Sequence, residues 1–344
     1  MPPVATYACV NLWNFQSHHQ SHPAHPPSSS QPSDLDALTA QHTFTGTADE
    51  SWFYMVSVAM EARGAYLVPA MLRTLEAAAR AGRDVGVVVA VAAGLQELAA
   101  GIGELGALLD RMDERCDPGV FYHRIRPFLA GSRNMGAAGL PRGVFYDETG
   151  EGEGGKGEWR QLRGGSNGQS SLVQFLDVVL GVEHAAMGNS SPDGSSKAGV
   201  ESFHQEVRRY MPEPHRRFLE DVAARYPGGM RKAVGDLLAD GTRGSREELT
   251  AVREAFEGAT RALAEFRNKH LQMVTRYIII PSRQPNPNQG VNLATASSRS
   301  KVSSEGTGAA PTAGELTGTG GTALLPFLKQ SRDETFQAGQ LQVR

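Results

Sequence analysis

The sequence predicts an all-α fold, and two observations support that prediction. Between residues 249 and 281 the apolar side chains recur at spacings of three and four, which is the period of one face of an α-helix. These residues are Val252, Phe256, Ala259, Leu263, Phe266, Met273 and Tyr277. In addition, the sequence shows no internal repeat and no alternating pattern long enough for a half-buried strand. We therefore expect helices that pack against one another around a shared core.

One histidine, His270, lies on this apolar stripe, and Pro281 ends the helix soon after it. The other positions are mostly charged or polar, so the histidine is expected to face the core. From the residues alone, two interpretations stay open. His270 is either a core histidine hydrogen-bonded to a carbonyl group, or an iron ligand held rigidly inside a helical bundle.

Composition excludes several classes of function. The 344 residues carry a net charge of −3 with both signs scattered, which gives no argument for binding nucleic acid or an anionic membrane. Cys9 and Cys116 have no metal-like spacing and are too few for a disulfide framework, as is typical of a reducing cytosol. The first residues do not resemble a secretory signal. The sequence therefore predicts a soluble, cytoplasmic globular protein.

An apolar stretch at residues 85–109 is the one candidate for a membrane span. Gln96, Glu97 and Glu104 interrupt it, which leaves far less than the ~20 apolar residues that a bilayer requires. We expect a buried helix there, and no membrane span.

The chain divides into five segments. Residues 1–15 are an apolar start that is expected to be internal, and residues 16–46 are rich in His, Pro and Ser, which predicts a disordered insertion. Four histidines there, His18, His19, His22 and His25, are alternatively a weak metal site. Residues 47–281 form the helical domain, residues 282–317 a flexible loop, and residues 318–344 a glycine loop with a short helix.

Within the helical domain, a helix is expected to begin at Thr47 or Asp49, with Gly64 as a kink or a close contact. Proline and glycine at positions 118, 119 and 127 are expected to break helical order, and the glycine-rich residues 137–168 to be mostly loop. Further helices are predicted at 169–182, 201–210 and 214–226, with a turn-rich surface loop at 186–196.

Five blocks of sequence resemble a known family, in that family's order. They are RPFLAG at 126–131, GGSNGQSS at 164–171, RRYMPEPHRRFL at 208–219, RNKHLQMVTRYIIIP at 267–281 and GTGGT at 318–322. The chain resembles the indoleamine 2,3-dioxygenases of the fungal kind from about residue 2 to about residue 330. The GGSNGQSS and HLQMVTRY blocks fit this family better than the related tryptophan 2,3-dioxygenases. The family's smaller amino-terminal helical domain is expected to be missing, which makes the chain a fragment or a shortened member.

The resemblance implies a large helical domain that binds haem b. It implies that His270 is the proximal ligand of the haem iron, that Asp177 is a carboxylate that orients this ligand, and that Arg267 lies on the propionate side. From the residues alone, Asp177 could equally be a helix cap or part of a salt bridge, and Arg267 a solvated charge on a helix face.

On the opposite side of the haem, the resemblance implies a substrate pocket. Phe121 would stack near an indole ring, and Arg126 would hold a carboxylate by a paired, charge-assisted contact. The other matching positions are Tyr7, Ser57, Ser166 and Thr319, the last of them in a loop that closes over the substrate. Without the resemblance, Arg126 would be interpreted as part of a structural salt bridge. GGSNGQ would be interpreted as a flexible turn.

The implied reaction inserts both atoms of O₂ across the indole C2–C3 bond of L-tryptophan and gives N-formyl-kynurenine, the first step of the kynurenine pathway. No acid or base residue is implied, and the family expectation is a monomer. Two alternatives remain: a truncated haem-binding homologue without dioxygenase activity, and a structural helical protein that binds no haem.

Overall fold

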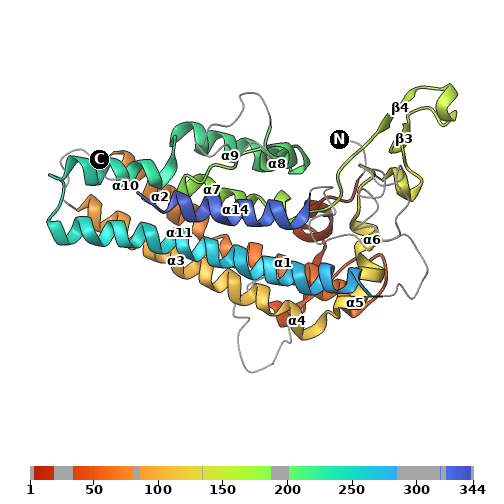
Figure 1. Cartoon of the computed structure of the whole chain (residues 1–344), viewed down its shortest axis with the longest axis horizontal. Helices are drawn as coiled ribbons and strands as arrows, with labels where there is room; N and C mark the ends of the chain where they lie inside the picture. Colours follow the sequence, from red (N-terminus) through yellow and green to blue (C-terminus); the bar gives the residue numbers. More distant parts are fainter. Residues whose placement is uncertain are drawn as a thin grey trace.

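The computed structural model describes residues 4–18, 34–80, 86–133, 135–186, 201–284, 318 and 323–341. Within these ranges the chain is an all-α bundle, as predicted (Figure 1). The α-helices are α1 (Ala48–Gly64), α2 (Leu67–Ala79), α3 (Val87–Asp110), α4 (Met112–Arg115), α5 (Pro118–Val120), α6 (Arg126–Leu129), α7 (Ser171–Leu180), α8 (Phe203–Val207), α9 (Glu213–Arg225), α10 (Gly229–Asp240), α11 (Arg246–Val274), α12 (Ile280–Ser282) and α14 (Leu324–Ala338).

Short turns of other helix types join these elements. Three are π-helical: η1 (Ala8–Leu12), η3 (Phe121–Ile125) and η8 (Thr275–Ile279). Five are 3₁₀ turns: η2 (Leu35–Ala37), η4 (Gly136–Ala138), η5 (Gly152–Gly154), η6 (Asn167–Gln169) and η7 (Arg208–Tyr210). The three π-turns were not predicted, because each is only five residues long and is too short to show a period of its own.

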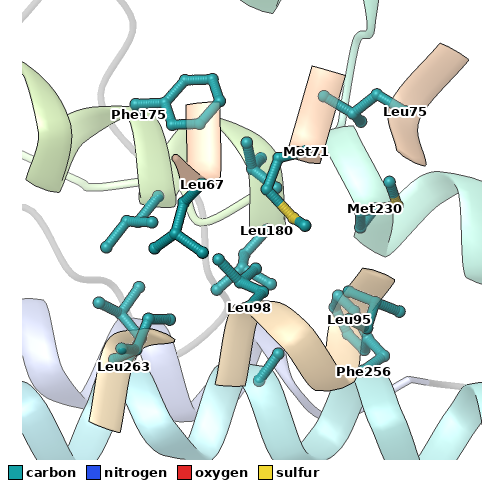
Figure 2. Packing of buried hydrophobic residues seen from close by; sticks show 14 of the residues in the cluster. Leu67, Met71, Leu75, Leu95, Leu98, Phe175, Leu180, Met230, Phe256 and Leu263 are labelled. Carbon is teal, nitrogen blue, oxygen red and sulfur yellow. The ribbon is translucent and has the colours of Figure 1, made fainter. Parts of the chain in front are cut away.

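The two longest helices, α11 and α3, run side by side through the length of the bundle (Figure 1). Leu263 and Phe256 of α11 face Leu98 and Leu95 of α3, and all four side chains are fully buried (Figure 2). Helices α2, α7 and α10 cover the same core with the side chains of Leu67, Met71, Leu75, Phe175, Leu180 and Met230. The apolar stripe read from the sequence is therefore the surface of α11 that packs into this core.

A capping box begins α11. The Ser245 hydroxyl accepts a hydrogen bond from the backbone N–H of Glu248 at 3.2 Å, and the Glu248 carboxylate accepts one from the backbone N–H of Ser245 at 2.7 Å. These bonds satisfy two amide groups that the helix itself leaves without a partner.

A Ser245→Ala variant is therefore expected to lower the free energy of unfolding by about 1 kcal/mol, because the cap loses its acceptor. Urea denaturation measures the change, and Ser245→Asp, which keeps a side-chain acceptor, is the matched control. Equal losses of stability in both variants would show that the side-chain acceptor at position 245 does not stabilise the helix.

Helix α3 matches the buried helix predicted at residues 85–109. By length and composition alone, the described stretch Val87–Arg115 could cross a membrane, but half of its most apolar window is buried inside the bundle. It packs against α11, α2 and α1. These contacts account for its apolar character as a core helix.

Two small antiparallel sheets are present that the sequence did not predict. In one, β1 (Phe15–Ser17) pairs with β2 (Leu38–Ala40). In the other, β3 (Val144–Asp147) pairs with β4 (Gly157–Arg160), and this hairpin projects from one end of the bundle (Figure 1). Residues 137–168 were expected to be mostly loop, and this hairpin is the exception. Its strands are four residues long, too short to show an alternating pattern, and rely on the cross-strand pair Phe145 and Trp159, whose ring centres lie 5.7 Å apart.

Helical order does break just before Pro118, at residues 116–117, but the breaks expected at Gly119 and Pro127 are absent. Helices α5 and α6 are joined by the π-turn η3, so residues 118–129 are continuously helical. Pro118 and Pro127 each stand in the first turn of a helix, where no backbone N–H is needed. Thr47 caps α1 by accepting from Glu50 N at 3.3 Å. Gly64 is a close contact, because an added Cβ would lie 2.3 Å from the Leu172 side chain.

Several predicted segments lie wholly or partly outside the described residues. Of the insertion expected at 16–46, residues 19–33 are not described, whereas both flanks are described and pair as β1 and β2. The predicted loops lie largely outside as well, with 187–200 and 285–317 not described, and so does Thr319. Helix α10 had no counterpart in the prediction.

Candidate active site

A cavity of about 240 Å³ opens where the end of α11 meets α1, the π-turns and the first turn of α14. Its wall includes seven of the nine predicted site residues: Tyr7, Ser57, Phe121, Arg126, Ser166, Arg267 and His270. Asp177 is described but does not line it, and Thr319 lies outside the described residues. Each of the three described π-turns supplies wall residues, namely Val10 and Asn11, Phe121, and Tyr277 and Ile278.

His270 projects from the last turns of α11 into this cavity. Phe266, Met273 and Val274 of the same helix form an apolar wall beside it. Burial, together with the nearby Arg267 cation, lowers the pKa of His270 to about 4. The imidazole is therefore neutral at pH 7, which is the form in which a histidine ligates a metal.

Arg267, one turn before His270, forms a buried ion pair with Asp177 of α7. Its Nη2 donates to both carboxylate oxygens of Asp177, at 2.7 and 2.8 Å. Its Nη1 donates to the hydroxyl of Thr335 on α14. Burial alone would raise the pKa of Asp177, but the Arg267 and His184 charges hold it well below its usual range. Because Asp177 bonds to Arg267 and His184, its predicted effect on His270 would be transmitted through Arg267.

His184 completes this network. Its Nδ1 lies 2.6 Å from Glu334 Oε2 of α14, and its Nε2 lies 3.2 Å from Asp177 Oδ2. Burial favours the neutral ring, but Asp177 and Glu334 outweigh it and raise the pKa of His184. Sequence reasoning missed His184 and Glu334, because they stand 150 positions apart in the chain.

Arg126 and Phe121 also line the cavity. Phe121 packs between the rings of Phe53 and Tyr277, with ring centres 4.9 and 5.7 Å away. The Arg126 guanidinium lies over the Tyr122 ring at 5.6 Å, and the side chain is only 2% exposed. Burial lowers its pKa, although arginine stays charged at neutral pH. The turn η3 and the first residue of α6 thus present an aromatic ring and a fixed cation to one cavity.

An unpredicted carboxyl group, Glu61 of α1, also lines the cavity. Its Oε1 accepts hydrogen bonds from the Tyr7 hydroxyl at 2.8 Å and from the Ser170 hydroxyl at 2.6 Å. Burial raises the pKa of Glu61, and burial with the Glu61 charge raises that of Tyr7. Glu61 stands four positions after the predicted Ser57, so helical spacing was the one available signal.

Ser166 belongs to a glycine loop that the backbone fixes in place. Gly165 N donates to Leu129 O at 3.1 Å, and the Ser166 hydroxyl accepts from Gly168 N at 3.2 Å. A Cβ on Gly164 would lie 2.0 Å from Leu129 O, so only glycine allows the two chain segments to approach. The loop is therefore ordered, whereas its composition in isolation indicated a flexible turn.

The arrangement combines a neutral histidine on an apolar wall, an arginine beside an aromatic ring, and an ordered glycine loop. The sequence profile of the family described as Indoleamine 2,3-dioxygenase matches residues 1–338. The chain belongs to this family. An indoleamine 2,3-dioxygenase of Saccharomyces cerevisiae is 39% identical over 337 residues, which cover 97% of this chain and 68% of that protein.

Other relatives of this family member carry different names. A 6-hydroxytryptophan 2,3-dioxygenase of Fusarium equiseti is 34% identical over 340 residues, covering 99% of this chain and 71% of that protein. A protein named myoglobin, from Haliotis madaka, is 30% identical over 250 residues, covering 73% of this chain and 52% of that protein. Membership of the indoleamine 2,3-dioxygenase family makes the chain an oxidoreductase of the dioxygenase class.

Proposed function

We propose that this protein is a haem b dioxygenase that converts L-tryptophan and O₂ into N-formyl-kynurenine. The observation that supports this most directly is the shared cavity of His270 and Arg126. One wall offers a neutral imidazole to a metal, and another offers a guanidinium to a carboxylate. This pairing suits an amino-acid substrate that must be held beside a metal cofactor.

The residues on the His270 side fit a haem. The imidazole has no hydrogen-bond partner among the described residues, and apolar side chains surround it, as a flat hydrophobic cofactor requires. Arg267, at the same wall, supplies positive charge for a propionate. When bound, the haem would supply the activation of O₂ for insertion of both its atoms across the indole C2–C3 bond. The product contains all atoms of both reactants, so no further reductant is needed.

The residues on the other side would bind and orient the amino acid. Arg126 would pair with its carboxylate, and the Phe121 ring would pack against the indole. Asn11 Oδ1 is buried without a hydrogen-bond partner among the described residues, so it is available to an N–H group of the substrate. Tyr7, Ser57 and Ser166 complete this wall, and Thr319 would belong to a loop that excludes water when it closes.

The full chain, reconstituted with haem and reduced, tests the proposal. A haem absorbance band, with formation of N-formyl-kynurenine from L-tryptophan, would support it. A haem band without product would instead support the second candidate, a haem-binding homologue without dioxygenase activity, which the myoglobin relative favours. If no haem binds, both candidates fail.

An Arg126→Leu variant is expected to raise the KM for L-tryptophan by about tenfold to a hundredfold, the usual effect of losing a charge-assisted hydrogen bond. Steady-state kinetics measure the change. Binding of tryptamine, which lacks the carboxylate, to the haem-loaded protein should change little, which separates this role from a general loss of the pocket. Equal losses for both compounds would contradict the assigned role.

We also propose that the protein is cytoplasmic, which the two free cysteines support, and monomeric, as the family resemblance implies. Fractionation and light scattering would test these two points.

A further inference from the structure

The π-turn η1 places one amide side chain, that of Asn11, at the cavity. Tyr7, Val10 and Asn11 all line the cavity, and their spacing of three and four residues puts them on one face of the turn. Cys9, which lies between them in the sequence, is exposed and stands outside the cavity wall. The turn therefore has a cavity side and a solvent side, and Asn11 belongs to the cavity side.

Asn11 is buried, yet its side-chain amide is not hydrogen-bonded. The residue is only 3% exposed, and its Oδ1 has no hydrogen-bond partner among the described residues. Its Nδ2 forms no hydrogen bond to a described residue either. Buried polar side chains usually have a partner, so the unpaired amide at the cavity wall points to a ligand.

Two hydroxyl groups at the same cavity already have a partner. The Tyr7 and Ser170 hydroxyls donate to Glu61 Oε1, at 2.8 and 2.6 Å. A ligand that accepted a hydrogen bond from either hydroxyl would have to replace a bond within the protein. It could bond to Asn11 without breaking any bond that the described residues form.

The chemistry of the amide favours a hydroxyl group as its partner. An asparagine side chain offers an acceptor oxygen and a donor nitrogen. A hydroxyl group can donate to the oxygen or accept from the nitrogen, whereas a ring N–H can only donate. The cavity wall also includes the side chains of Val10, Phe53 and Val56, which suit an aromatic ring but offer it no hydrogen bond. An aromatic ring that carries a hydroxyl group therefore matches this wall.

We propose that Asn11 is a specificity-determining residue that favours tryptophans hydroxylated on the six-membered ring of the indole. Its Oδ1 would accept a hydrogen bond from the ring hydroxyl, which takes no part in the insertion of O₂ across the C2–C3 bond. This inference rests on the proposed function, because it assumes that the cavity holds an indole. A site that bonds a substrate hydroxyl discriminates against the analogue without it, since the buried polar group is then left unpaired.

Steady-state kinetics of the haem-loaded protein test the inference, with L-tryptophan and its derivatives that carry a hydroxyl or a methyl group on the six-membered ring. The methyl group is close to the hydroxyl in size but cannot donate. In Asn11→Leu, kcat/KM is expected to fall about fivefold to tenfold for at least one hydroxylated derivative, and to change little for L-tryptophan and the methylated derivatives. Cys9→Ala, at the exposed position of the same turn, is the matched control and should change none of these values.

Calorimetric titration of the haem-loaded protein gives the dissociation constants of the same compounds without turnover. If Asn11→Leu and Asn11→Ala weaken all compounds equally, or if the unaltered protein treats hydroxylated and methylated derivatives alike, the inference is overturned while the proposed function stands. If no compound gives product but the hydroxylated derivatives still bind more tightly and only when Asn11 is present, the proposed function fails and the assigned preference stands. If no haem binds, both are overturned. Circular dichroism of each variant identifies any loss caused by misfolding.

Discussion

A His270→Ala variant is expected to lose stable haem binding and, with it, dioxygenase turnover. Among the α11 side chains that line the cavity, His270 carries the one imidazole, which is the proximal haem ligand of globins and peroxidases. Loss of a group that merely orients a metal ligand costs roughly 10-fold to 100-fold in affinity or activity. Loss of the ligand itself should exceed that range. Haem stoichiometry after desalting, the absorbance spectrum and product formation measure the effect.

Gln272→Ala is the matched control, because Gln272 is exposed on the same turn of α11 and should leave haem binding unchanged. Added imidazole should partly restore the spectrum of His270→Ala, since it can enter the space that the side chain leaves. A variant that keeps full haem content and an unaltered spectrum would remove His270 from the site and, with it, the proposed function.

An Asp177→Ala variant is expected to destabilise the fold by about 3 to 5 kcal/mol, because it leaves the buried Arg267 charge without its carboxylate. Urea denaturation of the haem-free protein measures the loss. Asp236→Ala is the control, because the Asp236 pair with Lys232 is exposed and should contribute about 0 to 1 kcal/mol. Similar losses in both variants would show that the buried pair stabilises the fold no more than the exposed pair does.

The pH dependence of the same measurement has a definite sign. The pKa of Asp177 is lower in the folded protein than in the unfolded chain, where it is about 3.9. Its contribution is therefore complete above that value and is lost as the pH falls through and below it. The difference in stability between the unaltered protein and Asp177→Ala should shrink in that acidic range.

Much of the fold could be predicted from the sequence, and seven of the nine candidate site residues line one cavity. The helix that carries His270 could be predicted, because the apolar residues on one face of an α-helix recur at spacings of three and four. For the cap of α1 and for Gly64 the sequence left two options each, and the structure selects Thr47 as the cap and a close contact at Gly64.

What could not be predicted depends on contacts between distant segments. Glu61 meets Ser170 over a separation of 109 positions, and His184 meets Glu334 over one of 150. No local pattern encodes such pairs. The π-turn that brings Phe121 and Arg126 to the cavity was missed because proline and glycine nearby indicated a break. The roles of the site residues came from family resemblance, and they stay predictions.

Helix α14 has two sets of contacts with one consequence. Its first turns give Leu324, Phe327 and Leu328 to the cavity wall, while Glu334 and Thr335 bond to His184 and Arg267. Docking this helix and filling the cavity are therefore not separate equilibria. A ligand that fills the cavity also stabilises the docked position of this helix, so the apparent affinity of the cavity reports how firmly the helix is docked.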